Sequence, residues 1–169
     1  MQSNVYFTLS LRFILLVLVQ VLLLNHINFL GYINPYLYLL FILTFPFNGN
    51  KSLLIIFSFL MGLTIDAFGD SGGVHAAACV VIAYFRPVIL KYSFGVSYEY
   101  NTIKINQVGF GQRLIYVSSM VLLHHLVLFS MEIFNINHIM LLLKSTLFSG
   151  IFSIILILSS ISIFSKKSK

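Results

Sequence analysis

The residues best equipped for chemistry lie in one short stretch of the chain, residues 61–87. Asp66 and Asp70 are two of only four acidic side chains, and Ser71, two glycines and His75 follow them at once. Carboxylate, hydroxyl and imidazole groups this close together can act as acid and base, hold a proton or cation, or join two helices by hydrogen bonds. The elements around the stretch decide between these roles.

The composition indicates a membrane protein. Of the 169 residues, 59% are hydrophobic and only 8% are charged, and the mean hydropathy is +1.00, whereas about 25% of a soluble domain is charged. The net charge of +6 comes from basic residues that flank apolar segments, where they meet lipid head groups, so we do not expect a nucleic-acid partner. The single cysteine, Cys79, allows no intramolecular disulfide and is interpreted as a packing residue.

Apolar runs predict an all-α integral membrane protein with one domain of about six transmembrane helices. The predicted spans are residues 11–30, 35–47, 52–68, 74–90, 114–134 and 139–164. The second is short, since thirteen helical residues reach about 20 Å against a hydrocarbon core of about 30 Å. It must thin the bilayer, draw in flanking residues or be sheltered by neighbours. A re-entrant pair formed by the second and third segments remains an alternative.

The basic residues predict the orientation of these spans. Cytoplasmic ends of membrane proteins retain Lys and Arg. If the N-terminus is inside, nine of the ten basic residues fall on the inner side and only Lys144 falls outside. We therefore expect a multi-pass membrane protein with both termini in the cytoplasm.

The third and fourth predicted helices carry matching faces of small residues. Ser58, Gly62 and Asp66 recur every four residues on the third, and the fourth has Ala76, Cys79 and Ala83 at spacings of three and four. Small faces let two helices approach closely in lipid. We expect an outward hairpin here.

Asp66 lies at the C-terminal end of its helix, where the helix dipole disfavours an anion, so it needs a partner. The candidates are His75 and the free amides that open the fourth helix, and Asp70 or Ser71 is the expected N-cap of that helix. A proton or cation site at Asp66 is the functional alternative.

Other chemistry-bearing residues do not form a recognisable catalytic or metal site. His124 and His125 are neighbours that point about 100° apart on a helix, which favours packing or interhelical hydrogen bonds over a zinc site. The sequence has no nucleophile motif and no phosphate-binding loop, so neither an enzyme nor a cofactor is expected. Arg86 and Pro87 are expected to end the fourth helix at the inner surface. The expected inner-surface contacts are Arg86, Lys91, Lys104 and Arg113.

The hairpin carries a pattern that resembles a known family. Gly62 and Asp66 fit a G-x-x-x-D motif, residues 73–76 (GVHA) fit the end of an L-G-x-H-A motif, and Ala83-Tyr84 fits A-Y. Together they resemble the signature of the MreD family of rod shape-determining proteins, and residues 34–47 resemble the second span of one branch of that family. Gly72 replaces the leucine often found before the motif's glycine, a departure that concerns local packing of the loop.

The resemblance implies a non-enzymatic scaffold subunit of the cell elongation machinery in the bacterial inner membrane. Its implied partners are MreC, together with MreB, RodA and the elongation penicillin-binding transpeptidase in one complex. The implied fold is similar to the substrate-binding component of energy-coupling factor vitamin transporters, although fold similarity does not transfer activity. A small-molecule transporter component is therefore the alternative function, and an enzyme is the third class.

Overall fold

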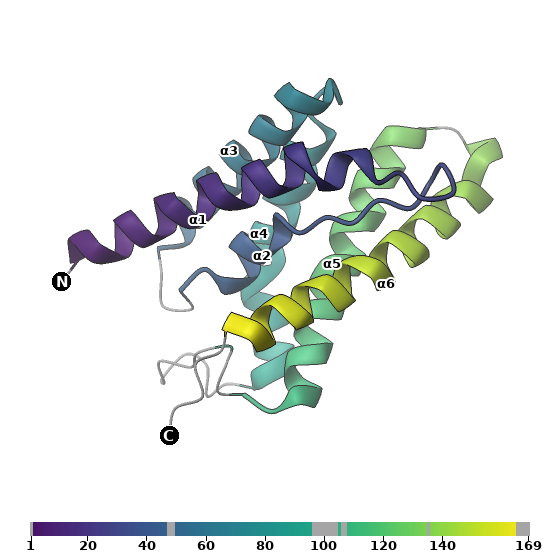
Figure 1. Ribbon diagram of the computed structural model, residues 1–169. Coiled ribbons are helices and arrows are strands. Elements are labelled where there is room, and N and C mark those ends of the chain that lie inside the picture. The colour runs from purple at the N-terminus through teal and green to yellow at the C-terminus, as the bar shows by residue number, and fades with distance from the viewer. Residues whose placement is uncertain (1, 47–49, 96–104, 106–107, 135, 165–169) are drawn as a thin grey trace.

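The computed structural model describes residues 2–46, 50–95, 105, 108–134 and 136–164. Throughout that part of the chain the regular structure is helical (Figure 1). The elements are α1 (Gln2–Leu22), η1 (Leu24–His26), α2 (Leu39–Thr44), α3 (Lys51–Gly69), α4 (Val74–Phe94), α5 (Phe110–Ile133), η3 (Ile136–His138) and α6 (Ile139–Phe164).

Five of the described helices are long and apolar enough to cross a membrane, namely α1, α3, α4, α5 and α6. Large apolar side chains lie exposed along them, for example Leu15 on α1, Phe59 on α3 and Ile151 on α6. A water-soluble protein rarely exposes so much apolar surface, whereas lipid chains accept it. The molecule therefore has the architecture of an all-helical, multi-pass membrane protein.

Four of the predicted spans coincide closely with helices, but the predicted ends shift. The first helix begins and ends earlier than predicted, because Asn25, His26 and Asn28 turn the chain and Asn28 has a φ of 23°. The fourth continues beyond Pro87 to Phe94. Proline removes one N–H and crowds the preceding turn, but here the surrounding helix is maintained, so the expected end at Arg86-Pro87 was wrong.

The prediction that residues 35–47, the second of the six predicted spans, form a spanning helix was also wrong. Only six residues of this segment, α2, are helical, and at 1.5 Å per residue they reach about 9 Å. The chain from Tyr32 to Tyr36 is not helical. We call residues 32–46 the return segment, because they lead the chain back from the end of α1 towards the start of α3 (Figure 1).

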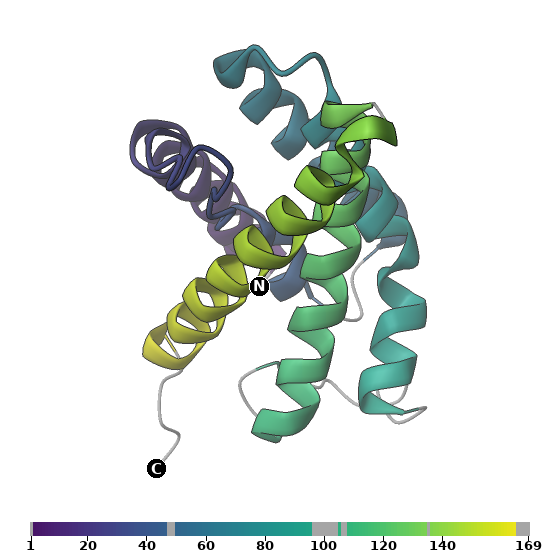
Figure 2. The same ribbon diagram turned by 90° about the vertical axis from the view of Figure 1, so that its right-hand side faces the viewer.

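The helices form a tilted bundle around the return segment. α3 packs against α4, α4 against α5, α5 against α6, and α1 against α3. In Figures 1 and 2 the α3–α4 turn and the α5–α6 turn lie at the top, while the end of α4 and the start of α5 lie at the bottom. α1 and α6 run on either side of the return segment in Figure 1, so the broken part of the chain is sheltered by intact helices.

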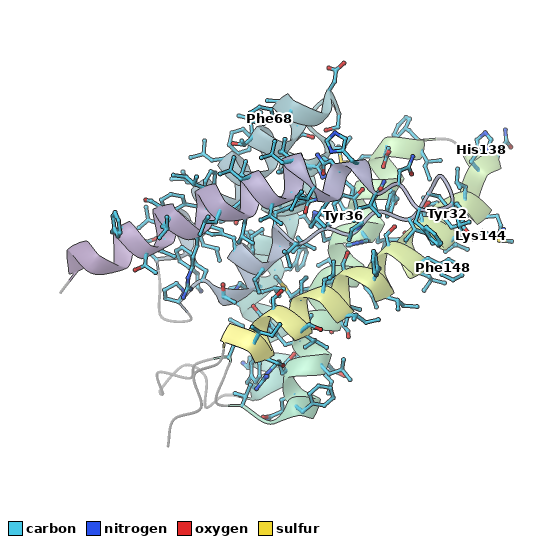
Figure 3. The ribbon with its side chains drawn as sticks, viewed as in Figure 1. Tyr32, Tyr36, Phe68, His138, Lys144 and Phe148 are labelled. Carbon is cyan, nitrogen blue, oxygen red and sulfur yellow. The ribbon has the colours of Figure 1, made fainter. Side chains whose placement is uncertain are left out.

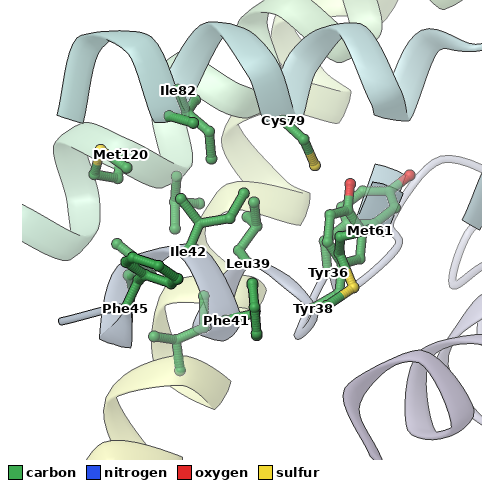
Figure 4. Packing of buried hydrophobic residues seen from close by; sticks show 14 of the residues in the cluster. Tyr36, Tyr38, Leu39, Phe41, Ile42, Phe45, Met61, Cys79, Ile82 and Met120 are labelled. Atoms are coloured by element: carbon green, nitrogen blue, oxygen red, sulfur yellow. The ribbon is translucent and has the colours of Figure 1, made fainter. Parts of the chain in front are cut away.

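The core of the bundle is built on α2. Its Leu39, Phe41, Ile42 and Leu43 are almost fully buried, and they meet side chains of the surrounding helices such as Ile82 and Met120 (Figure 4). Since the second segment is surrounded by protein, it needs no apolar length to match the bilayer.

Candidate functional site

The faces of α3 and α4 predicted from the sequence do meet. Ser58, Gly62 and Asp66 are buried on α3, and Ala76, Cys79 and Ala83 are buried on α4. A Cβ added to Gly62 would overlap the backbone of Ala76 and the carbonyl oxygen of His75. Glycine at position 62 therefore permits the close helix approach on which contacts in lipid depend.

The Asp66 carboxylate joins the end of α3 to the start of α4. Its Oδ1 accepts hydrogen bonds from the His75 N–H at 3.1 Å and from Ser71 Oγ at 2.6 Å, and its Oδ2 accepts from the Ala76 N–H at 2.8 Å. Of the two predicted partners, the amides that open α4 are the ones bound, and they are also the positive end of that helix dipole. The carboxylate thus caps the following helix from the preceding one.

The expected N-cap role of Asp70 or Ser71 was wrong. The N-cap residue of α4 is Gly73, with φ at 93° and no side chain to contribute, and Asp66 supplies the capping group instead. Asp70 is the C-cap of α3, in the left-handed region at φ 49°, and it is exposed. The Ser71 hydroxyl contributes by binding Asp66 rather than by capping α4 itself.

A second polar site holds the non-helical part of the return segment. Gln20 of α1 is buried, its amide nitrogen donates to the Pro35 carbonyl oxygen at 3.0 Å, and its Oε1 accepts from the Leu37 N–H at 2.9 Å. From α6, Ser149 Oγ accepts from the Asn34 N–H at 3.1 Å and Ser153 Oγ accepts from the Tyr36 N–H at 2.9 Å. These side chains replace the backbone partners that a helix would have provided, as an apolar surrounding requires.

Two tyrosines of the return segment and three histidines form a buried ring cluster, which we define as Tyr36, Tyr38, His75, His124 and His125. The Tyr38 hydroxyl lies 2.9 Å from His75 Nδ1 and 2.9 Å from His124 Nε2, so it links the return segment to α4 and α5. The Tyr36 ring, labelled in Figure 3, packs against His75 of α4 and His125 of α5, with its centroid 5.2 Å from that of His125. The cluster therefore joins three elements: the return segment, α4 and α5.

The contacts of the ring cluster are compatible with one set of neutral histidine tautomers. His125 Nδ1 lies 2.8 Å from the Val121 carbonyl oxygen, which can only accept, so this nitrogen carries the proton. His125 Nε2 then accepts from Ser153 Oγ at 3.2 Å. With His124 Nδ1 as an acceptor 3.4 Å from His125 Nδ1, His124 Nε2–H donates to Tyr38, and Tyr38 O–H donates to His75 Nδ1. The hydrogen bonds thus run in one direction across the cluster.

Arg86 was expected at the inner surface, and the structure places it elsewhere. Its side chain is buried, its Nε donates to the Tyr116 hydroxyl at 2.9 Å, and one terminal nitrogen donates to the carbonyl oxygens of Leu43 and Phe45. These carbonyls close α2, and a cation is favourable at the C-terminal end of a helix. Arg86 therefore fixes the return segment from α4, because buried polar groups need such partners.

The other predicted residues lie apart from these sites. Tyr84, which the family-like motif groups with the hairpin residues, is exposed on the outside of α4 and takes no part in the hairpin packing. Lys91 is exposed near the end of α4 and Arg113 is in the first turn of α5, where it donates to the Val108 carbonyl oxygen. Lys104 lies outside the described residues.

Within the described ranges, no group of three or more His, Cys, Asp or Glu side chains is arranged to hold a metal ion. The histidines of the ring cluster instead bond to a tyrosine, a serine and a backbone carbonyl. What these groups do chemically is hold helices and a non-helical segment in register.

Sequence reasoning missed the partners of the return segment, although two signals were present. Gln20 is an amide inside an otherwise apolar span, and such residues in membrane helices usually bind a neighbouring element. On α6, Ser145, Ser149 and Ser153 recur every four residues and all three are buried. Small or polar residues at this four-residue spacing also identified the packing face of α3.

Comparisons with protein-family models, with curated proteins and with solved structures gave no match for this chain.

Proposed function

We propose that this chain is a non-enzymatic membrane scaffold subunit of the bacterial cell elongation machinery, similar to the MreD family. It would bind MreC and support lateral peptidoglycan synthesis in one complex with MreB, RodA and the elongation penicillin-binding transpeptidase. Its place would be the inner membrane with both termini in the cytoplasm, as the distribution of Lys and Arg favours.

One observation carries the proposal. Residues of the family-like motif, Gly62, Asp66, His75 and Ala76, come together where α3 and α4 are in close backbone contact. Each has a packing or capping role there, and together they hold a short, fixed turn at one end of the bundle. A motif used in this way suits a protein that presents a surface to partners.

A substrate-binding component of a vitamin transporter is the second candidate. The observation that favours it is the broken return segment, because discontinuous helices form substrate sites in many transporters. In this chain the non-helical backbone is bound by Gln20, Ser149 and Ser153, which favours the scaffold.

Co-purification from the native membrane separates the two candidates. We expect the tagged chain to capture MreC and other elongation proteins, and depletion in a rod-shaped host to give rounded cells with normal vitamin uptake. Capture of an ATPase and a coupling subunit, with normal cell shape and lost uptake, would show the transporter instead.

A matched pair of variants ties this test to the hairpin. Gly62→Val should fail to restore cell width after depletion, because its side chain would overlap α4. Gly69→Ala should restore it, because a Cβ there meets only Ser71 Oγ at an ordinary 3.6 Å. If Gly62→Val fully restored cell width, the close contact between α3 and α4 would not be needed for the function.

A further inference from the structure

The exposed tyrosine on α4 lies at an unusual depth. Tyr84 is the eleventh of the 21 residues of α4, a helix whose length of about 32 Å matches a hydrocarbon core of about 30 Å. Its side chain is 68% exposed. Tyrosine is enriched at the two membrane interfaces, where its hydroxyl meets water and head groups, whereas Tyr84 lies at the midpoint of a helix that is long and apolar enough to span the bilayer.

Other hydroxyls on the outer faces of the bundle find a hydrogen-bond acceptor within their own helix. Thr64 Oγ1, Ser130 Oγ and Ser162 Oγ each donate to the carbonyl oxygen four residues earlier. A tyrosine hydroxyl stands at the far end of an aromatic ring and cannot reach back in this way. Tyr84 has a ring contact with Phe85, at 5.4 Å between centroids, and no hydrogen bond to any described residue.

The residues around Tyr84 form a continuous surface. Val88 lies one turn further along the same face of α4 and is 64% exposed, and Phe85 flanks both. We call these three residues the Tyr84 face. Apolar side chains here need no partner, because lipid chains suit them, but a hydroxyl without a hydrogen bond in hydrocarbon is costly.

We propose that the Tyr84 face docks against a membrane-spanning helix of another protein, and that a polar side chain of that helix accepts a hydrogen bond from the Tyr84 hydroxyl. Lipid tails have no acceptor to offer at this depth. A second copy that docked through the same face would bring bulky rings against bulky rings, whereas membrane helices associate closely through small residues. A partner helix with small residues and one acceptor fits both features.

The inference rests on depth, exposure and hydrogen-bonding chemistry, so it is independent of the proposed function. If the Tyr84 face fails its test, the elongation role still stands or falls on cell width and on MreC capture.

Photocrosslinking in the native membrane tests the proposal. A benzoylphenylalanine would replace Val88, next to the hydroxyl, and in a control chain it would replace Ile155, an exposed residue of α6. We expect position 88 to form an adduct with a membrane-spanning peptide of another protein, and position 155 to form none with that peptide. Peptide mapping by mass spectrometry identifies the adduct.

The hydroxyl itself is tested by Tyr84→Phe in the position 88 chain. Loss of one interhelical hydrogen bond should lower the adduct yield about 3- to 30-fold, at an expression level where yield rises linearly with protein. Tyr92→Phe, a change to an 80% exposed tyrosine near the inner end of α4, should leave the yield unchanged. Adducts with lipid alone, adducts with a second copy of this chain, or a yield that ignores Tyr84→Phe would each overturn the proposal.

Discussion

At the scale of single residues, one carboxylate resolves two unfavourable situations at once. Asp66 lies in the last turn of α3, where the dipole of its own helix is unfavourable for an anion. By accepting the amides of His75 and Ala76, it gains the favourable end of the α4 dipole and satisfies N–H groups that would otherwise face an apolar surrounding. The residue is thus held by the neighbouring helix rather than by a counter-ion.

We predict that Asp66→Ala lowers the thermal unfolding temperature of the purified protein in detergent, because two buried N–H groups lose their acceptor at a cost of about 1–3 kcal/mol each. Asp66→Asn should do less damage, since its amide oxygen can still accept one of these bonds. Asp70→Asn is the matched control, since Asp70 is exposed on the same turn and asparagine tolerates its left-handed backbone at φ 49°, and it should unfold like the wild type. Equal loss in Asp66→Ala and Asp66→Asn would contradict the capping role.

The sequence predicted the contacts of this site between residues that are close in the chain and missed those between residues that are far apart. The spacing of Ser58, Gly62 and Asp66 lies within one helix, and the partner amides come ten residues or fewer after Asp66, so local periodicity was sufficient. Arg86 shows the limit. Its partners Leu43 and Phe45 lie more than forty residues earlier in the chain, and no local pattern indicates that a basic residue near a predicted helix end will turn inward.

At the scale of elements, the return segment illustrates a broken span that is stabilised by side chains. The sequence predicted a helix here because residues 35–47 are apolar and begin with proline, which suits a first helical turn. The competing factor was tertiary: Gln20, Ser149 and Ser153 offer backbone partners, so an extended stretch costs little. Only the length of the segment argued against this prediction, because thirteen residues are too few to cross the membrane as a helix.

We predict that Gln20→Leu loosens the return segment, because the Leu37 N–H and the Pro35 carbonyl lose their partner in the protein interior. The single cysteine reports this directly. Cys79 is fully buried and its side chain points towards the rings of Tyr36 and Tyr38 (Figure 4), so it reacts with a maleimide only when this region opens. The labelling rate in detergent should rise about 5- to 150-fold, as expected for a cost of about 1–3 kcal/mol.

Gln112→Leu serves as the control for this measurement, since Gln112 is exposed in the first turn of α5. It should leave the rate of Cys79 labelling unchanged. Unchanged labelling in Gln20→Leu would show that α6 and Arg86 hold the return segment without help from α1.

At the scale of the whole molecule, the described residues contain five helices long enough to span a membrane, and the shorter return segment lies between the first two of them. The number of crossings, and hence the side on which the chain ends, depends on whether the return segment passes from one face of the membrane to the other. In Figure 1, α1 and α3 run in the same general direction, with the return segment leading back between them. This arrangement predicts six crossings made by five helices and one broken segment.

Cysteine labelling decides the topology. In a Cys79→Ala background, Phe29→Cys places a thiol before the return segment, Lys51→Cys places one after it, and Asp70→Cys places one at the far end of α3; all three positions are exposed. A membrane-impermeant maleimide added to intact cells should label Phe29→Cys and Asp70→Cys but not Lys51→Cys, which should react only after the membrane is opened. Positive charge at the inner ends requires the same result, since Lys51, Lys91 and Arg113 then share the cytoplasmic side. If Phe29→Cys and Lys51→Cys reacted from the same side, the return segment would be re-entrant, and α1 would have to enter the membrane in the opposite direction from α3.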